Sequence, residues 1–171
     1  LPDAAAIEAV ALVTNPKVKL IDTSTAHRTL PDWAYGFPEL APAFREKIAS
    51  SNRIAVPGCY ASGFNALVYP LVSGDILPAD YPIVCYAMSG YSGAGNKGIA
   101  QYEAADRDPE LDSPRQYALT QQHKHLKEMG AISHLARTPI FAPHICDYPC
   151  GMTVSVPLFA DLLKKRMTPA D

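Results

Sequence analysis

A single cysteine, Cys59, lies where a β-favouring run gives way to an apolar helical stripe. Residues 53–56 read Arg-Ile-Ala-Val, Pro57-Gly58 follow, and from Phe64 onward apolar residues recur at three- and four-residue spacing. We therefore expect Cys59 at or just before the first turn of a helix, where free backbone N–H groups and the helix dipole favour negative charge. A thiol placed there loses its proton more readily than a free one, and the thiolate is the nucleophile. The stretch predicts covalent catalysis, with a small buried cysteine as the alternative.

A second stretch with possible chemistry is the glycine-rich run at residues 89–98, Ser-Gly-Tyr-Ser-Gly-Ala-Gly-Asn-Lys-Gly. Glycines permit close approach of the backbone to a ligand, and Lys97 adds a positive charge, so the run suits a phosphate or a ribose. Glycine-rich turns after strands are also common without a ligand. His144 follows Pro143 at a predicted strand end and could pair with Cys59 as an acid or base, provided that the fold brings them together.

The sequence predicts no metal site. His144, Cys146 and Cys150 lack a fourth ligand for a zinc site. His123 and His125 fall on a predicted helix at residues 116–129 and are two positions apart, so they should not share a face.

Composition limits the classes of function. The chain has 171 residues, a formal net charge of −2 and 48% hydrophobic residues, which indicates one sizeable domain or parts of two. Without a basic stripe (the densest basic run is residues 164–166) we expect no nucleic-acid partner. No apolar segment has transmembrane length and no secretion signal is present, so we expect no membrane partner. Four cysteines at no framework spacing indicate reduced thiols in the cytoplasm. The first residue is Leu1, and we expect an interior fragment of a longer protein.

The order of predicted elements indicates an α/β region followed by an α+β region. An open parallel sheet binds ligands beyond the carboxyl ends of its strands. No Gly-x-Gly-x-x-Gly follows a strand within residues 1–56, so the phosphate-binding opening of a dinucleotide fold is expected upstream of Leu1. The last two strands lack a crossover helix, which predicts an antiparallel portion. The predicted boundary divides residues 1–56, the end of a nucleotide-binding domain, from residues 57–171, a second domain incomplete at its C-terminus. The predicted helices are residues 1–14, 41–50, 60–73, 99–107 and 116–129, and the predicted strands are residues 17–22, 53–56, 82–88, 138–142 and 152–159.

Five ordered motifs carry a resemblance that covers essentially the whole chain. They are Asp-Thr-Ser-Thr-Ala-His-Arg at 22–28, Tyr-Gly-Phe-Pro-Glu-Leu at 35–40, Pro-Gly-Cys-Tyr at 57–60, Ser-Gly-Tyr-Ser-Gly-Ala-Gly at 89–95 and Phe-Ala-Pro-His at 141–144. Together they resemble the shorter type of N-acetyl-gamma-glutamyl-phosphate reductase, an enzyme family of bacterial arginine biosynthesis.

The resemblance implies a Rossmann-like NADP-binding domain followed by a semialdehyde-dehydrogenase-type catalytic domain with a mixed or antiparallel sheet. It also implies NADPH-dependent reduction of N-acetyl-glutamyl 5-phosphate to the 5-semialdehyde through a thioester on Cys59. A homo-oligomer, dimer or tetramer, is implied as well. The roles carried over are acid–base catalysis for His144, cofactor contact for Ser92 and Gly93, and substrate contact for Arg28, Ser89 and Gly90. For Arg28, a salt bridge that fixes its loop is the alternative.

Three other functions remain open at this point. The first is an enzyme like aspartate-semialdehyde dehydrogenase, although that family usually has an asparagine before its cysteine and a glutamine after the adjacent turn, and neither is present here. The second is a non-catalytic oligomerisation module. The third is a cysteine hydrolase, which would need an Asn or Asp to orient His144. Without the upstream phosphate-binding turn, residues 1–171 alone are expected to bind NADP weakly.

Overall fold

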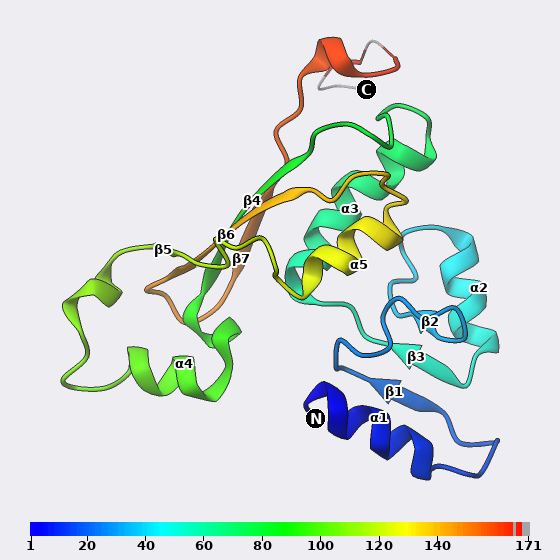
Figure 1. Cartoon of the computed structure of the whole chain (residues 1–171), viewed down its shortest axis with the longest axis horizontal. Helices are drawn as coiled ribbons and strands as arrows, with labels where there is room; N and C mark the ends of the chain where they lie inside the picture. Colours follow the sequence, from blue (N-terminus) through cyan, green and yellow to red (C-terminus); the bar gives the residue numbers. More distant parts are fainter. Residues whose placement is uncertain (166, 169–171) are drawn as a thin grey trace.

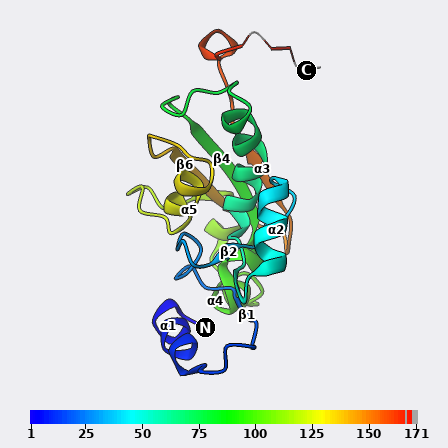
Figure 2. The ribbon, with the colours of Figure 1, turned by 90° about the vertical axis from the view of Figure 1, so that its right-hand side faces the viewer.

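The structure, a computed structural model, describes residues 1–165, 167 and 168, and contains two sheets (Figures 1 and 2). Three short 3-10 helices at Tyr91–Ala94, Pro109–Asp112 and Ala160–Leu162 complete the secondary structure of the described part. The helices and strands are α1 (Asp3–Leu12), β1 (Leu20–Asp22), β2 (Ala34–Tyr35), α2 (Pro42–Ser50), β3 (Arg53–Ala55), α3 (Cys59–Ser73), β4 (Val84–Gly90), α4 (Gly95–Tyr102), β5 (Arg115–Gln116), α5 (His125–Ile132), β6 (Ile140–Cys146) and β7 (Met152–Ser155).

The first sheet is parallel and has the order β1-β3-β2. Parallel neighbours need a crossover connection, and α2 supplies it between β2 and β3. Because the carboxyl ends of parallel strands meet at one edge, the segments that follow β1 and β3 lie side by side: the Val56 N–H donates to the Asp22 carbonyl at 2.8 Å. This edge faces the start of α3, which carries Cys59 (Figure 1).

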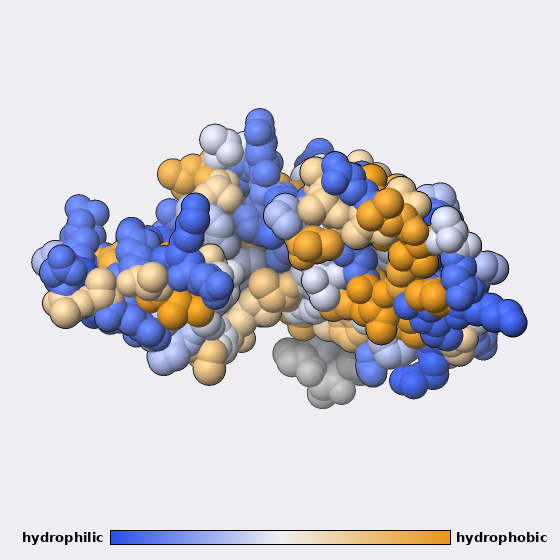
Figure 3. Space-filling view, turned by 90° about the horizontal axis from the view of Figure 1, so that it is seen from below, coloured by the Kyte–Doolittle hydropathy of each residue, from blue (hydrophilic) through white to orange (hydrophobic). Residues whose placement is uncertain are grey.

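The helix predicted at residues 1–14 forms as α1. The helix begins after Pro2 without a side-chain cap, and the Asp3 carboxylate instead accepts hydrogen bonds from the backbone N–H and hydroxyl of Thr25. Of its residues only Ala6 is buried, whereas Ile7 is 55% exposed and Ile21 of the adjacent β1 is 68% exposed. Figure 3 shows hydrophobic residues gathered on this side of the molecule. The described part of the chain therefore leaves the apolar face of α1 and β1 uncovered.

The second sheet is mixed and has the order β5-β6-β4-β7. The central strands β4 and β6 are parallel over seven residue pairs, while β7 runs antiparallel to β4 and β5 runs antiparallel to β6. The antiparallel portion predicted from the sequence is therefore present, although β7 pairs with β4 and not with β6.

One face of the second sheet is covered by α3 and α5, and the main core lies between them. Phe64 and Val68 of α3 and Met129 of α5 pack there against Ala87 and Phe141, all with relative exposure of 1% or less. Side chains alternate between the two faces of a strand, so the other face presents Val84, Tyr86 and Ile140 at 37%, 41% and 57% exposure. The described residues leave this outer face without a covering layer.

The prediction of a helix at residues 116–129 is wrong. Its first part is the short strand β5 and a series of turns, and the helix α5 begins only at His125 and continues through Gly130. The reason is pairing with the edge of β6. The Tyr117 N–H donates to the Pro143 carbonyl, and the Gln121 side chain both donates to and accepts from the Phe141 backbone at 2.8 Å. Tertiary hydrogen bonds thus override the local helical pattern.

Other predicted boundaries also shift. The strand predicted at residues 17–22 begins only at Leu20, the strand predicted at residues 82–88 is β4 at 84–90, and the strand predicted at residues 152–159 ends at Ser155. The strand predicted at residues 138–142 is β6, which continues to Cys146 because it pairs with β4 along its whole length. The helix predicted at residues 99–107 is α4, which begins at Gly95, so the glycine-rich run folds into a 3-10 helix followed directly by α4.

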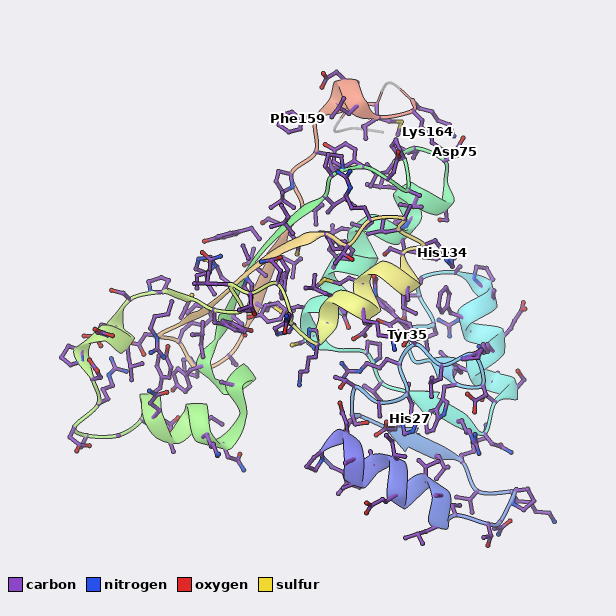
Figure 4. The ribbon with its side chains drawn as sticks, in the orientation of Figure 1. His27, Tyr35, Asp75, His134, Phe159 and Lys164 are labelled. Carbon is purple, nitrogen blue, oxygen red and sulfur yellow. The ribbon has the colours of Figure 1, made fainter. Side chains whose placement is uncertain are left out.

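The segment after β7 returns to the far end of α3. Lys164 forms an ion pair with Asp75 at 2.5 Å, whereas Phe159 is 71% exposed (Figure 4). Of the basic run at residues 164–166, the structure describes Lys164 and Lys165, which are exposed, and residue 166 lies outside the described residues. Among the described residues, no helix is long and apolar enough to cross a bilayer.

Replacement of Phe64 tests the packing of α3 on the second sheet. Phe64 is fully buried, so Phe64→Ala removes a large apolar side chain and leaves a cavity, and we expect the free energy of unfolding to fall by about 3–5 kcal/mol. Leu67 on the same helix is 44% exposed, and Leu67→Ala should cost about 1 kcal/mol or less. Urea unfolding followed by circular dichroism measures both. Equal losses in the two variants would contradict the described core.

Candidate active site

Cys59 is the first residue of α3 and is exposed. Gly58 precedes the helix with an extended backbone (φ −74°, ψ 147°), so the chain leaves β3, turns at Pro57-Gly58 and enters the helix as predicted. Cys150 is also exposed, whereas Cys85 and Cys146 are buried, and burial raises the pKa of the Cys85 thiol to about 12. Among the described cysteines, Cys59 is thus the accessible thiol at a helix amino terminus.

Cys59 opens into a cavity of about 320 Å³. Its walls come from four places in the sequence: the start of α3, the end of β4 with the glycine turn, the carboxyl end of β6, and the segment just before α5. The lining residues are Cys59, Tyr60, Ser89, Gly90, Gly93, Ala94, Tyr117, His123, Lys124 and Ile145. The cavity therefore joins the predicted nucleophile to the predicted glycine turn.

The glycines of this turn are required by close packing. A Cβ atom at Gly90 would lie 2.6 Å from the Tyr148 carbonyl oxygen, and one at Gly93 would lie 2.9 Å from the Ser89 hydroxyl. Ser89, Gly90 and Gly93 all line the cavity, as their predicted roles require. Ser92 is exposed and is not among the lining residues, and its N–H donates to the Pro149 carbonyl at 3.2 Å.

Arg28 lies in a buried ion pair instead of at the cavity wall. Its Nη1 donates to Glu128 at 3.1 Å, its Nε to the Val56 carbonyl at 2.8 Å and its Nη2 to the Thr23 carbonyl at 3.0 Å. This is the salt-bridge role weighed as the alternative to substrate contact. Figure 4 shows Tyr35, whose hydroxyl donates to the other oxygen of Glu128, between the first sheet and α5.

The structure does not bring His144 to the described wall of the cavity. Position 144 of β6 alternates with Phe141, Pro143 and Ile145, which face the helices or the cavity, so its side chain lies on the outer face of the sheet. There its ring packs on Tyr86 with centroids 4.8 Å apart, and its Nδ1 lies 3.2 Å from the Ala142 carbonyl.

The imidazole in the cavity is that of His123, which sequence reasoning assigned to a helix interior. Because α5 starts only at His125, residue 123 belongs to the preceding segment, and its ring contacts Tyr60, Tyr117 and Phe141 at centroid distances of 5.0–6.0 Å. Burial, and next the charge of Lys124, lower the pKa of His123 from 6.5. In the sequence, the run His-Lys-His at 123–125 was the feature that could have indicated a histidine and a cation at the site.

His125 is close to His123 but does not line the cavity. The two rings are 4.7 Å apart. The expectation that both residues lie on one helix without sharing a face is wrong, because His123 precedes α5. Burial lowers the pKa of His125 to about 3, with further contributions from His123, Arg28 and Lys124. At neutral pH, His125 is therefore an uncharged side chain packed against the Gly58 turn.

The electrostatics of the cavity favour an anionic ligand. Among its described lining residues, Lys124 is the one cationic side chain, and the amino terminus of α3 adds partial positive charge. Tyr60 and Tyr117 complete the wall, and burial raises the pKa of both hydroxyls, so they stay protonated hydrogen-bond donors. No group of three or more potential metal-ligating side chains occurs among the described residues.

Comparison with known proteins identifies relatives along nearly the whole chain. The N-acetyl-gamma-glutamyl-phosphate reductase of Brucella ovis is 48% identical over 166 residues, and that of Burkholderia cenocepacia is 42% identical over 168 residues. These alignments cover 96% and 98% of this chain and 54% of each relative. The chain thus spans about half the length of the curated relatives it matches.

Solved structures show the same fold at low sequence identity. Aspartate semialdehyde dehydrogenase II of Vibrio cholerae superimposes with a TM-score of 0.57 at 18% identity, over 91% of this chain and 52% of that chain. The Francisella tularensis aspartate semialdehyde dehydrogenase gives 0.58 at 12% identity, over 88% and 52%. Residues 59–171 match the family described as "Semialdehyde dehydrogenase, dimerisation domain". The matched region begins at the residue that we identify as the candidate nucleophile, and the chain belongs to the semialdehyde dehydrogenase family.

Proposed function

We propose that this chain forms part of an NADP-dependent N-acetyl-gamma-glutamyl-phosphate reductase of arginine biosynthesis and carries its nucleophile. The observation that supports this most directly is the exposed Cys59 at the start of α3, in one cavity with the glycine turn, His123 and Lys124. The similarity of this chain to N-acetyl-gamma-glutamyl-phosphate reductases, at 42–48% identity, supports the same function. The free thiols fit a reducing compartment such as the cytoplasm.

The first chemical step is attack by the Cys59 thiolate on the carbonyl carbon of the acyl phosphate. A carbon–sulfur bond forms, the carbon–oxygen bond to phosphate breaks, and phosphate leaves with the electron pair, which gives a thioester on Cys59. Lys124 and the amino terminus of α3 stabilise the negative charge on the departing phosphate. When bound, NADPH supplies the hydride that reduces this thioester to a thiohemiacetal. Collapse of the adduct releases the aldehyde and regenerates the thiolate.

We assign the proton transfers to His123 and not to His144, because His123 lines the cavity with Cys59 and His144 lies on the other face of the sheet. The lowered pKa of His123 leaves its imidazole neutral at pH 7. To take the thiol proton at Nε2, the ring must carry its own proton on Nδ1 and so give up the hydrogen bond that Nδ1 accepts from the His125 N–H at 3.1 Å. The same imidazole returns the proton to the oxygen of the reduced adduct and removes it again as the aldehyde forms.

We place the cofactor between the glycine turn and the first region of the fold. Gly93 lines the cavity without a side chain, so a flat ring can lie against its backbone, and Ser92 lies next to it with an exposed side chain. We propose that residues 1–56 belong to the nucleotide-binding domain and residues 57–171 to the catalytic domain. The parallel first sheet and the uncovered apolar face of α1 and β1 support this division, since such a sheet is normally buried on both faces.

The outer face of the second sheet is the proposed interface between two copies of the enzyme. It presents Val84, Tyr86 and Ile140, with His144 packed on Tyr86, and it lies in the region matched by a dimerisation domain. An apolar sheet face is self-complementary across a twofold axis, as a symmetric dimer requires. In this arrangement His144 contributes to assembly and not to proton transfer.

Substitution of the nucleophile tests the assigned chemistry. In the complete enzyme, Cys59→Ser should abolish NADPH oxidation with N-acetyl-glutamyl phosphate, because a hydroxyl at this position is not ionised, while the circular dichroism spectrum stays unchanged. Cys150→Ser, at the other exposed cysteine, is the matched control and should keep full activity. Faster turnover of aspartyl phosphate than of N-acetyl-glutamyl phosphate by the wild-type enzyme would overturn the substrate assignment.

Substitution of each histidine in turn distinguishes the roles of His123 and His144. His123→Asn should lower kcat by about 10²–10⁴-fold because it removes the acid–base group, whereas His144→Asn should change kcat by less than about twofold. The direction of the pKa shift of His123 can also be tested. Because the imidazole must be neutral to act and its pKa is lowered from 6.5, activity should persist as pH falls to 6.5 and decline only below it. A pH–rate profile from pH 5 to 8 measures this limb. A large loss in His144→Asn alone would reverse the assignment.

The dimer interface is tested by placing a charge on the outer face. Tyr86→Glu introduces a carboxylate into an apolar contact and should convert a dimer to monomers in sedimentation velocity experiments. Leu67→Glu, at a similarly exposed apolar position on α3, should leave the dimer intact. A dimer that survives Tyr86→Glu would show that assembly uses another surface.

A further inference from the structure

The turn that carries Cys59 is held on both sides of Pro57 by one buried ion pair. Before the proline, the Val56 carbonyl accepts a hydrogen bond from Arg28 Nε at 2.8 Å. After it, the Gly58 N–H donates to Glu128 Oε1 at 2.9 Å. The Arg28 and Glu128 side chains are themselves joined at 3.1 Å and are only 7% and 2% exposed. Two side chains 100 positions apart in the sequence thus form hydrogen bonds with the same three-residue turn, residues 56–58.

The backbone at Gly58 packs directly against this pair and leaves no room for a side chain. A Cβ atom on Gly58 would lie 2.6 Å from Arg28 Nη1 and 2.3 Å from His125 Nε2. Gly58 is also the residue immediately before the helix and has no side chain with which to cap it. Glu128 therefore makes, from another helix, the contact that a glutamate in the first turn makes in a capping box.

The position of Glu128 in the sequence links this turn to the proposed acid–base group. Glu128 lies in the first turn of α5, and His123 lies just before that helix. The ion pair thus joins the element that carries the thiol to the element that carries the imidazole. Through Thr23, whose carbonyl accepts from Arg28 Nη2, it also reaches the edge of the first sheet.

We propose that Arg28 and Glu128 are positioning residues that set the place of Cys59 relative to His123 and to the first sheet. The proposal rests on the function proposed above, and it deepens that function, because neither residue touches the reacting atoms. Covalent catalysis needs the thiol close to both the substrate carbonyl and the base, and an error of about 1 Å can cost about a hundredfold in rate. Loosening the turn should therefore lower kcat, while the cavity that binds substrate stays unchanged.

The test replaces both charges together, since removing one would leave the other buried and unpaired. The double variant Arg28→Met/Glu128→Leu removes the contacts to Val56, Gly58 and Thr23 while keeping apolar bulk. Tyr35→Phe is the matched control: it deletes a hydrogen bond to the same Glu128 oxygen (2.7 Å) but leaves the ion pair and its hold on the turn.

The first readout is independent of catalysis. Amide hydrogen exchange by NMR at Gly58 is compared with exchange at Val68, a buried residue of the same helix, so that a change in global stability cancels. We expect the ratio of the Gly58 rate to the Val68 rate to rise at least tenfold in the double variant and to stay within threefold of wild type in Tyr35→Phe. An unchanged ratio in the double variant would overturn the proposal.

The second readout is steady-state kinetics of the complete enzyme at a temperature where circular dichroism shows every variant folded. In the double variant kcat should fall about a hundredfold with KM for the acyl phosphate within threefold, whereas Tyr35→Phe should keep both values. A rise in KM with kcat unchanged would show that Arg28 binds substrate and would overturn the positioning role. Absence of reductase activity in the wild-type enzyme would instead refute the proposed function, and the exchange measurement would still decide whether the pair holds the turn.

Discussion

The buried carboxylate of Glu128 is the constraint on which the arrangement of this chain depends. A charge with 2% exposure is costly unless it is paired and hydrogen-bonded, so the fold must bring donors to it. Three donors reach it: Arg28 from the loop after β1, Tyr35 from β2, and the Gly58 amide before α3. The Tyr35 hydroxyl in turn accepts from Asn65, whose side-chain oxygen accepts from Ser133. Because these groups come from both regions, satisfying one carboxylate fixes the first sheet against α3 and α5.

The contacts of Glu128 determine where the ends of the helices and strands around the candidate site lie. Cys59 begins a helix immediately after the turn held by the ion pair, and the glycine turn leaves the carboxyl end of β4, a strand in the middle of the second sheet. His123 and Lys124 precede α5, which Glu128 ties to the same turn. The groups of the candidate site thus lie on short segments, while the helices and strands behind them supply rigidity. This division is common in α/β enzymes, whose sites lie where strands end.

The two faces of the second sheet have different surroundings, and this separates the two histidines. The inner face is sealed by α3 and α5 over a core of Phe64, Val68 and Phe141. The outer face keeps its apolar side chains exposed and carries His144 against Tyr86. A histidine one position away on β6 would have faced the helices and the cavity. The alternation of side chains along one strand therefore decides which imidazole can meet the thiol.

Much of this site was predictable from the sequence, and the remainder was not, for a physical reason. Local patterns were sufficient for Cys59 at a helix start and for the glycine turn, because a strand, a Pro-Gly turn and a helical stripe are encoded by adjacent residues. The contacts of Arg28 and the identity of the cavity histidine depend on partners far away in the sequence. Arg28 pairs with Glu128. His123 lies outside a helix because the residues before His125 form hydrogen bonds with the edge of β6. The sequence alone determined the candidate nucleophile and the turn beside it. Only the tertiary structure decided which imidazole and which ion pair accompany them, because long-range hydrogen bonds outweigh the weak local preference of residues 116–124 for a helix.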